Sequence, residues 1–267
     1  MMTPRQPVAA IATDLAGETP ATADRTVRPD RQTQRVQSLT RRYEVLYLNA
    51  LGDVEDMTRV APATPVFEDA FAALARGTLI STVHGPVAVE DLLPGTLVDT
   101  VENGPQMLLW VGSMTVYPET AEVQGGEAAR LTRLATDAFG LGRPMPDLML
   151  GPRARVLYRN SRCVELLGTN QAFAPARGFV DGVSVIEVAP VSPVRVFHLG
   201  FRGQQILLAN GMEVESYHPG SQIEAVMDRN SRDLFLSLFP HVSGLEDFGP
   251  MHTPRLTAFE LENLRLA

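Results

Sequence analysis

Turn-forming residues recur at short intervals from Gly77 onward, and this spacing limits what the chain can fold into. The runs TLISTV, TLVDTV and MLLWVG are rich in apolar and β-branched residues. Turn sequences separate them at 84–86 (HGP), 94–95 (PG) and 103–105 (NGP). Because Gly and Pro favour tight turns and interrupt regular elements, each run is confined to a short strand. The pattern predicts a mainly β fold, a sandwich or barrel of many short strands.

Three other patterns precede or interrupt the strand-rich region. Alternating residues around Tyr43, followed by a turn sequence at 51–53, predict a β-hairpin. The apolar residues of 67–75 fall on one helical face and predict a short helix. A second internal helix is expected over 126–140, with Gly140 placed to end it.

Helical patterns also follow the strand-rich region. Ser221 and Glu224 have the spacing of a capping box, which predicts a helix after them. The segment RDLFLSLFP predicts a second helix that stops at Pro240, and Thr257 with Glu260 predicts a third. We therefore expect a small C-terminal helical appendage on a mainly β chain.

These patterns divide the chain into four parts. The first part lacks helical or strand periodicity and predicts a disordered, solvated leader. Up to Arg42 it carries seven Arg against four acidic residues, a net charge of +3. The expected parts are the leader at 1–38, the hairpin and short helix at 39–70, the strand-rich domain at 71–220, and the helices at 221–267.

Composition narrows the possible partners and cofactors. The net charge of -8 disfavours nucleic acid, whose phosphates it would repel. No apolar run reaches the length of a membrane span, so we expect no membrane insertion and a cytoplasmic location, with export by an uncleaved signal as the alternative. The single Cys163 allows neither an internal disulfide nor a zinc cluster, and no metal or cofactor is expected.

Three ordered blocks of the sequence resemble bacterial Hint domains, the autoprocessing module of hedgehog proteins and inteins. The first runs from ARGTLI to LLWVG, the second is DLMLGPRARVLY, and the third is VFHLGFRGQQILLANGMEVESYHPG. The resemblance implies the two-lobed β horseshoe of that family over about residues 70–220. The motif residues that carry it are Gly77, Thr78, Glu90, Asp91, Gly95, Pro152, Glu215, Ser216, Pro219 and Gly220.

Active relatives use a cysteine that attacks the preceding carbonyl, a histidine that protonates the departing nitrogen, and often a further histidine in the third block. Counted back from the Gly77-Thr78 pair, the cysteine position of the resemblance falls on Ala73. The histidine of the second block corresponds to Ala154, and that of the third block to Gln204. The resemblance therefore implies a degenerate domain without catalytic residues.

We expect this domain to act as a binding or scaffolding module for an unknown protein partner, without self-cleavage. An autoprocessing domain with a hydroxyl nucleophile, Thr78 or Ser81, is the alternative. A thiol hydrolase centred on Cys163 is a weaker one, since a lone cysteine is more often a core residue. We also expect a core role for Trp110, a satisfied core or edge position for His198, and a solvated surface role for the Glu90-Asp91 pair.

Overall fold

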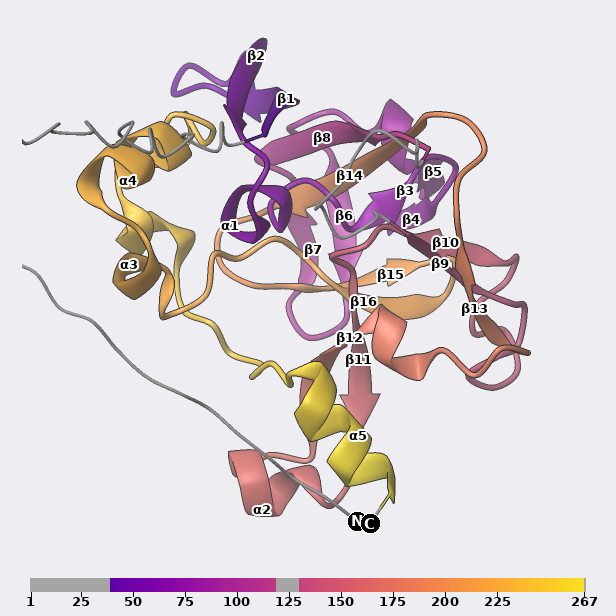
Figure 1. The fold of residues 1–267 in the computed structure, drawn as a ribbon. Coiled ribbons are helices and arrows are strands. Elements are labelled where there is room, and N and C mark those ends of the chain that lie inside the picture. Colours follow the sequence, from indigo (N-terminus) through magenta and orange to yellow (C-terminus); the bar gives the residue numbers. More distant parts are fainter. Residues whose placement is uncertain (1–38, 119–129, 267) are drawn as a thin grey trace, which may run out of the picture. The chain divides into compact units, whose positions relative to one another are not determined.

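The computed structural model describes residues 39–118 and 130–266, which form two antiparallel β-sheets and several short helices (Figure 1). The mainly β class and the helices after the last strand are confirmed. The expected leader at 1–38 lies outside the described residues. No helix of the described ranges is both long and apolar enough to cross a membrane.

The first sheet has the strand order β13-β9-β10-β3-β14-β8-β1-β2. Its β8 and β14 pair along their whole length, and β1 pairs with both β8 and β2. The expected hairpin is confirmed as β1 and β2, with the Asn49 side chain accepting hydrogen bonds from the turn backbone. The strands are β1 (Thr40–Leu48), β2 (Val54–Pro62), β3 (Leu74–Ala75), β8 (Trp110–Val116), β9 (Leu131–Leu134), β10 (Leu148–Leu150), β13 (Val185–Val188) and β14 (Val194–Gly200).

The second sheet has the order β12-β11-β16-β15-β4-β6-β7, with β5 paired to β4. Asn210 and Gly211, both with positive φ, form the two-residue turn between β15 and β16. Asn210 also accepts a hydrogen bond from the Leu79 N–H (2.7 Å), which ties this turn to β4. The strands are β4 (Leu79–Thr82), β5 (Gly85–Ala88), β6 (Leu97–Thr100), β7 (Gly104–Met107), β11 (Arg155–Arg159), β12 (Gln171–Pro175), β15 (Ile206–Ala209) and β16 (Met212–Glu215).

Short helices connect and follow the sheets. Asp228 caps one of them by accepting a hydrogen bond from the Ser231 N–H, and Thr257 with Glu260 forms the expected capping box of the last. The α-helices are α1 (Pro65–Glu68), α2 (Cys163–Leu167), α3 (Ile223–Val226), α4 (Arg229–Leu236) and α5 (Ala258–Leu266), and the 3-10 helices are η1 (Val89–Asp91), η2 (Ala176–Phe179) and η3 (Leu245–Phe248).

Three helix predictions need correction. The helix expected over 126–140 is wrong for its described part, which contains β9, paired on both edges to β10 and β13. The helix expected over 67–75 is limited to α1, and the chain then enters β3. A helix does follow Ser221, but its N-cap is Gln222, whose side chain makes no capping hydrogen bond, so that capping box is wrong.

An aromatic cluster joins the first sheet to the C-terminal helices. Trp110 on β8 is fully buried and stacks on Phe239 at 4.8 Å between ring centroids. Its indole N–H donates to the Leu238 carbonyl (2.8 Å). The Phe71 ring packs edge-on against the Trp110 ring, with 5.3 Å between the ring centroids. Tyr217 stacks on Phe239 at 5.2 Å. The expected core role of Trp110 is confirmed, and the cluster fixes the segment just before β3.

Candidate functional site

The peptide between Ala72 and Ala73 lies where α1 leads into β3, and backbone groups hold it from two sides. The Ala73 N–H donates to the Phe197 carbonyl of β14 (3.1 Å). The Ala72 carbonyl accepts from the Arg153 N–H (2.9 Å), and the Ala73 carbonyl accepts from the Gly151 N–H (2.7 Å). The second block of the sequence is therefore in direct contact with the peptide ahead of the Gly77-Thr78 pair.

Gly151 is required for this close approach. A Cβ atom added there would lie 2.3 Å from the Ala72 carbonyl oxygen, which is closer than any real contact. The obstacle is backbone, so it cannot rotate away as a flexible side chain would. The chain therefore needs Gly at this position to keep the present path of the Ala72–Ala73 peptide.

Ala73 and Ala154 both lie in the same hydrophobic cluster and are 2% and 3% exposed. The Ala154 backbone is engaged as well, because its N–H donates to Gly151 and its carbonyl accepts from Ala176. Each side chain is a methyl group, which offers neither a lone pair nor a transferable proton. These two side chains therefore contribute packing and no reactive group.

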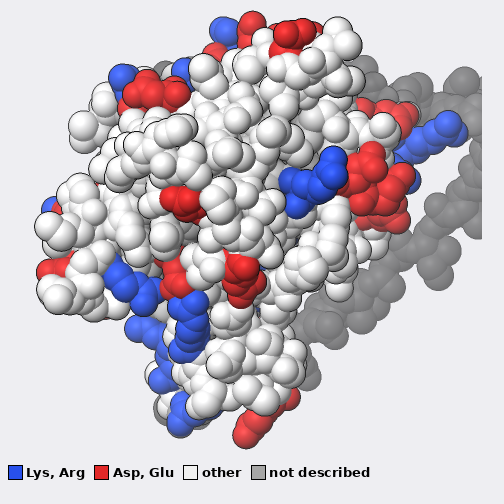
Figure 2. All heavy atoms as spheres, turned by 180° about the vertical axis from the view of Figure 1, so that it is seen from behind, with Lys and Arg blue, Asp and Glu red and all other residues white. Residues whose placement is uncertain are grey.

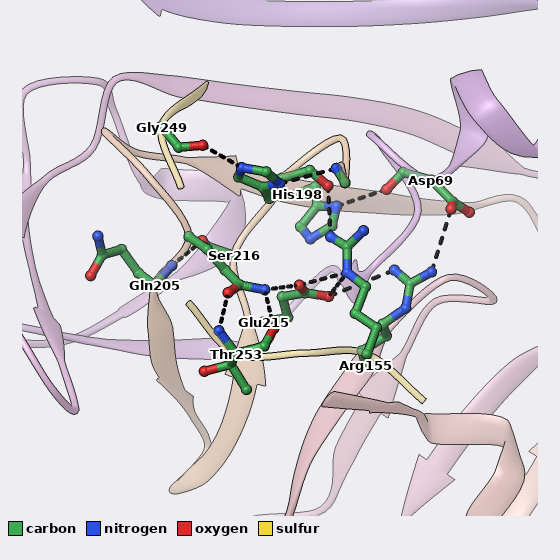
Figure 3. A network of polar contacts seen from close by, with 12 residues as sticks. Asp69, Arg155, His198, Gln205, Glu215, Ser216, Gly249 and Thr253 are labelled. Atoms are coloured by element: carbon green, nitrogen blue, oxygen red, sulfur yellow. Dashed lines mark hydrogen bonds and ion pairs between the residues drawn. The ribbon is translucent and has the colours of Figure 1, made fainter. Parts of the chain in front are cut away.

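Gln204 and Gln205 make structural hydrogen bonds in the third block (Figure 3). The Gln204 amide donates to the Glu215 carboxylate and to the Thr253 carbonyl, and it accepts from the Thr253 N–H (2.8 Å). The Gln205 N–H donates to the Ser216 hydroxyl (2.8 Å). The Gln205 side-chain amide accepts from Asn103 (2.8 Å) and donates to the Arg202 carbonyl (3.3 Å). Both buried amides are thus satisfied, and the Gln204 contacts tie the start of β15 to the segment before α5.

Beside this amide network, charged side chains form one alternating series of ion pairs. Arg155 lies between two carboxylates, 3.5 Å from Asp69 and 3.7 Å from Glu215. Glu215 is buried and bonds to Arg255 at 2.8 Å. Figure 3 shows Asp69, Arg155 and Glu215 directed toward one another. The series, in order of contact, is Arg41, Glu68, Arg153, Asp69, Arg155, Glu215 and Arg255.

His198 is buried next to this series, which confirms its expected core role. Its Nδ1 lies 2.9 Å from the Asp69 carbonyl oxygen, so the neutral ring donates there. Burial lowers the pKa of His198 to about 4, against the opposing effect of the Asp69 carbonyl. The imidazole is therefore neutral at physiological pH and helps to position the end of α1.

The motif residues of the first block shape turns. Gly77 has a φ of +86° and donates its N–H to the Glu90 carboxylate (2.8 Å). Gly95 has a φ of +94° and donates to the Leu108 carbonyl. The Glu90 carboxylate therefore stabilises the turn at Gly77, which corrects its expected surface role. Asp91, at the end of η1, is exposed.

The motif residues of the other blocks adjoin the network. Pro152 sits between Gly151 and Arg153. Pro219 precedes Gly220, which has a φ of +88° and donates its N–H to the His218 ring (3.0 Å). Glu215 and Ser216 end and follow β16, where they bond to Gln204 and Gln205 as described above.

The other candidate nucleophiles are Thr78, Ser81 and Cys163. The Thr78 hydroxyl is buried and donates to the Ala75 carbonyl (2.7 Å). Ser81 lies on β4 of the second sheet, opposite Pro86 on β5. Cys163 is buried at the start of α2, and burial raises the pKa of its thiol, which disfavours the reactive thiolate.

Sequence reasoning did not identify Glu68, Asp69, Tyr217 and Arg255 as parts of this region. Asp69 and Arg255 are far apart in the sequence, and both meet Arg155 or Glu215 only through the fold. The available signal was the spacing of Arg153 and Arg155, which places two guanidinium groups in one block and calls for carboxylate partners.

Charge is distributed without a strong single-sign patch on the face in Figure 2. Acidic and basic side chains lie beside one another there, and broad areas carry neither. Such a face does not provide the clustered positive charge by which proteins bind a phosphate backbone.

The fold is a two-sheet β domain in which the second and third blocks both contact the backbone of Ala72 and Ala73, just ahead of the first block. A sequence model described as the Hint domain matches residues 72–221, and the chain belongs to this family. A solved structure that is similar is the bacterial intein-like domain from Clostridium thermocellum, with 14% sequence identity and a TM-score of 0.35. The match covers 55% of this chain and 99% of that domain. No curated protein matches the chain.

Proposed function

We propose that this Hint domain does not cleave itself and instead serves as a binding or scaffolding module. The observation that carries the proposal is the pair of buried methyl groups, Ala73 and Ala154, beside the Ala72–Ala73 peptide. An acyl shift needs a nucleophile next to the scissile carbonyl and a proton donor for the departing nitrogen. Loss of the nucleophile or its partner removes roughly 10⁶-fold of rate in a covalent mechanism.

The segment before Ala73 supports the same proposal. Phe71 and Ala72 are fully buried, and Asp69 pairs with Arg153 and Arg155. A flanking segment that self-cleavage would release does not need to be part of the hydrophobic core of the domain. Here it contributes to the folded structure, as expected for a domain that stays joined to it.

The test is the mass of the purified full-length chain after incubation with a thiol or with hydroxylamine. We expect the intact 29.1 kDa species to persist. A matched triple variant, Ala73→Cys, Ala154→His and Gln204→His, restores the three groups of active relatives and should yield fragments under the same conditions. Fragments of the wild-type chain divided between Ala72 and Ala73 would contradict the proposal. If cleavage were found elsewhere, Thr78→Ala and Ser81→Ala variants would test the hydroxyl alternative.

A further inference from the structure

A cavity of about 530 Å³ opens at one end of the ion-pair series. Arg155, Arg255 and Tyr217 line one part of it, while most of its wall is apolar and includes Ile223 and Val226. Small-molecule sites in proteins have volumes of roughly 300–1,000 Å³ and combine apolar walls with a few convergent polar groups. The cavity has both properties.

The ion-pair series that reaches the cavity carries unequal numbers of positive and negative side chains. The series of direct ion pairs contains four arginines and three carboxylates, so it carries a net charge of +1 in a protein whose net charge is -8. Two of the four arginines, Arg155 and Arg255, border the cavity. Two carboxylates, Asp69 and Glu260, also border it. Asp69 is paired with Arg153 and Arg155, and Glu260 is bonded to the Thr257 N–H and hydroxyl at the start of α5.

Hydrogen-bond donors at the cavity are also incompletely used. Arg155 makes only long contacts, at 3.5 Å to Asp69 and 3.7 Å to Glu215. Arg255 uses Nε on Glu215 and Nη2 on the His218 carbonyl, which leaves Nη1 without a partner among the described residues. The Tyr217 hydroxyl likewise has no hydrogen-bond partner in the described part of the chain. Three residues that line the cavity therefore keep donor groups without a short hydrogen bond.

We infer that this cavity binds a small monocarboxylate with an apolar chain. The carboxylate would accept hydrogen bonds from Arg155, Arg255 and Tyr217 and would neutralise the surplus positive charge of the series. The apolar chain would lie along the wall that includes Ile223 and Val226 and would remove that surface from water. The inference rests on the proposed function, because it gives the binding module its first ligand class.

The experiment is calorimetric titration of the full-length protein with octanoate and with octanamide, its neutral analogue. We expect octanoate to bind, and octanamide to bind at least about tenfold more weakly, since it lacks the charge that the arginines recognise. Equal binding of the two compounds, or no binding of octanoate at millimolar concentration, would overturn the inference.

A pair of surface variants tests the location without disturbing the ion pairs. Val226 borders the cavity and is 66% exposed. Val226→Asp therefore places a negative charge at the rim of the cavity, where it would repel the octanoate carboxylate and should weaken binding about tenfold. Val191→Asp makes the same change at a site that is 98% exposed and outside the cavity, and should leave binding unchanged. Wild-type affinity in Val226→Asp, or an equal loss in both variants, would overturn the inference. Loss of octanoate binding would leave the intact-mass result standing, so the two proposals fail separately.

Discussion

Single residues at the Ala72–Ala73 peptide act through their size as much as their chemistry. Gly151 allows the second block to approach the Ala72 carbonyl, and the side chains of Ala73 and Ala154 are packed in one hydrophobic cluster. The same region of the fold therefore serves as packed core. Substitutions there should change stability in a way that depends on which atom they meet.

Gly151→Ala tests this dependence. Its methyl group would lie 2.3 Å from a backbone oxygen, so we expect a loss of about 1–3 kcal/mol in the free energy of unfolding. Gly244→Ala is the control, because the atoms nearest to its methyl group belong to the exposed carboxylate of Glu246, which can rotate away. Denaturant unfolding monitored by circular dichroism measures both. Equal stability of Gly151→Ala and wild type would show that the peptide path is not constrained by this contact.

His241 is a residue whose polarity the structure does not use. Its Nδ1 is buried and has no hydrogen-bond partner within the described residues, and its ring packs near Trp110, Phe239 and Phe248. His241→Phe removes this buried polar atom and should raise the free energy of unfolding at pH 7 by about 1 kcal/mol. His84→Phe, at an exposed turn, should produce no such gain in the same unfolding experiment. Destabilisation by His241→Phe would reveal a polar interaction that this account lacks.

At the scale of elements, the segment from α1 to β3 belongs to both hydrophobic cores. Phe71, Ala72 and Ala75 lie in the aromatic cluster, whereas Ala73 and Leu74 lie in the other cluster. The segment thus joins the two cores. Its removal or cleavage would expose both.

Phe71→Ala measures this contribution. Phe71 is fully buried and packs against Tyr43 at 4.5 Å and Trp110 at 5.3 Å between ring centroids. We expect a loss of about 3–5 kcal/mol on substitution. Phe259→Ala on α5 removes the same side chain where it is 72% exposed and should cost less than about 0.5 kcal/mol. Similar losses in the two variants would mean that the segment before Ala73 is not part of the cooperative core.

The placement of elements between two cores also explains which predictions failed. Leu131 and Leu134 are three residues apart, as on one face of a helix, but they lie on β9 and face different clusters. A strand buried on both faces loses the simple alternation that identifies strands. The turn-dense runs and the hairpin were predictable because Gly, Pro and Asn fix their ends locally. The partners of Arg155 were not, because Asp69 and Glu215 reach it only through the complete fold.

At the scale of the whole molecule, buried histidines link the stability of the fold to pH. Burial lowers the pKa of His198 and of His241 to about 4, and it lowers the pKa of His218 as well. An unfolded histidine titrates near pH 6.5. Between pH 6.5 and pH 4 the unfolded chain therefore binds more protons than the folded protein, and the free energy of unfolding decreases as the pH falls.

The variant His241→Phe isolates the contribution of one histidine to this pH dependence of the free energy of unfolding. Each such histidine contributes up to about 1.4 kcal/mol per pH unit in this interval, so the variant should show a correspondingly shallower loss of stability between pH 6.5 and pH 5. Above pH 7 histidine is neutral in both states, and the pH dependence of variant and wild type should there coincide. Urea unfolding at pH 5, 6 and 7 measures the difference, with His84→Phe as the control for altered surface. If His241→Phe kept the wild-type dependence on pH, protonation of His241 would not be coupled to unfolding, and the loss of stability between pH 6.5 and pH 5 would have to arise at other groups such as His198 and His218.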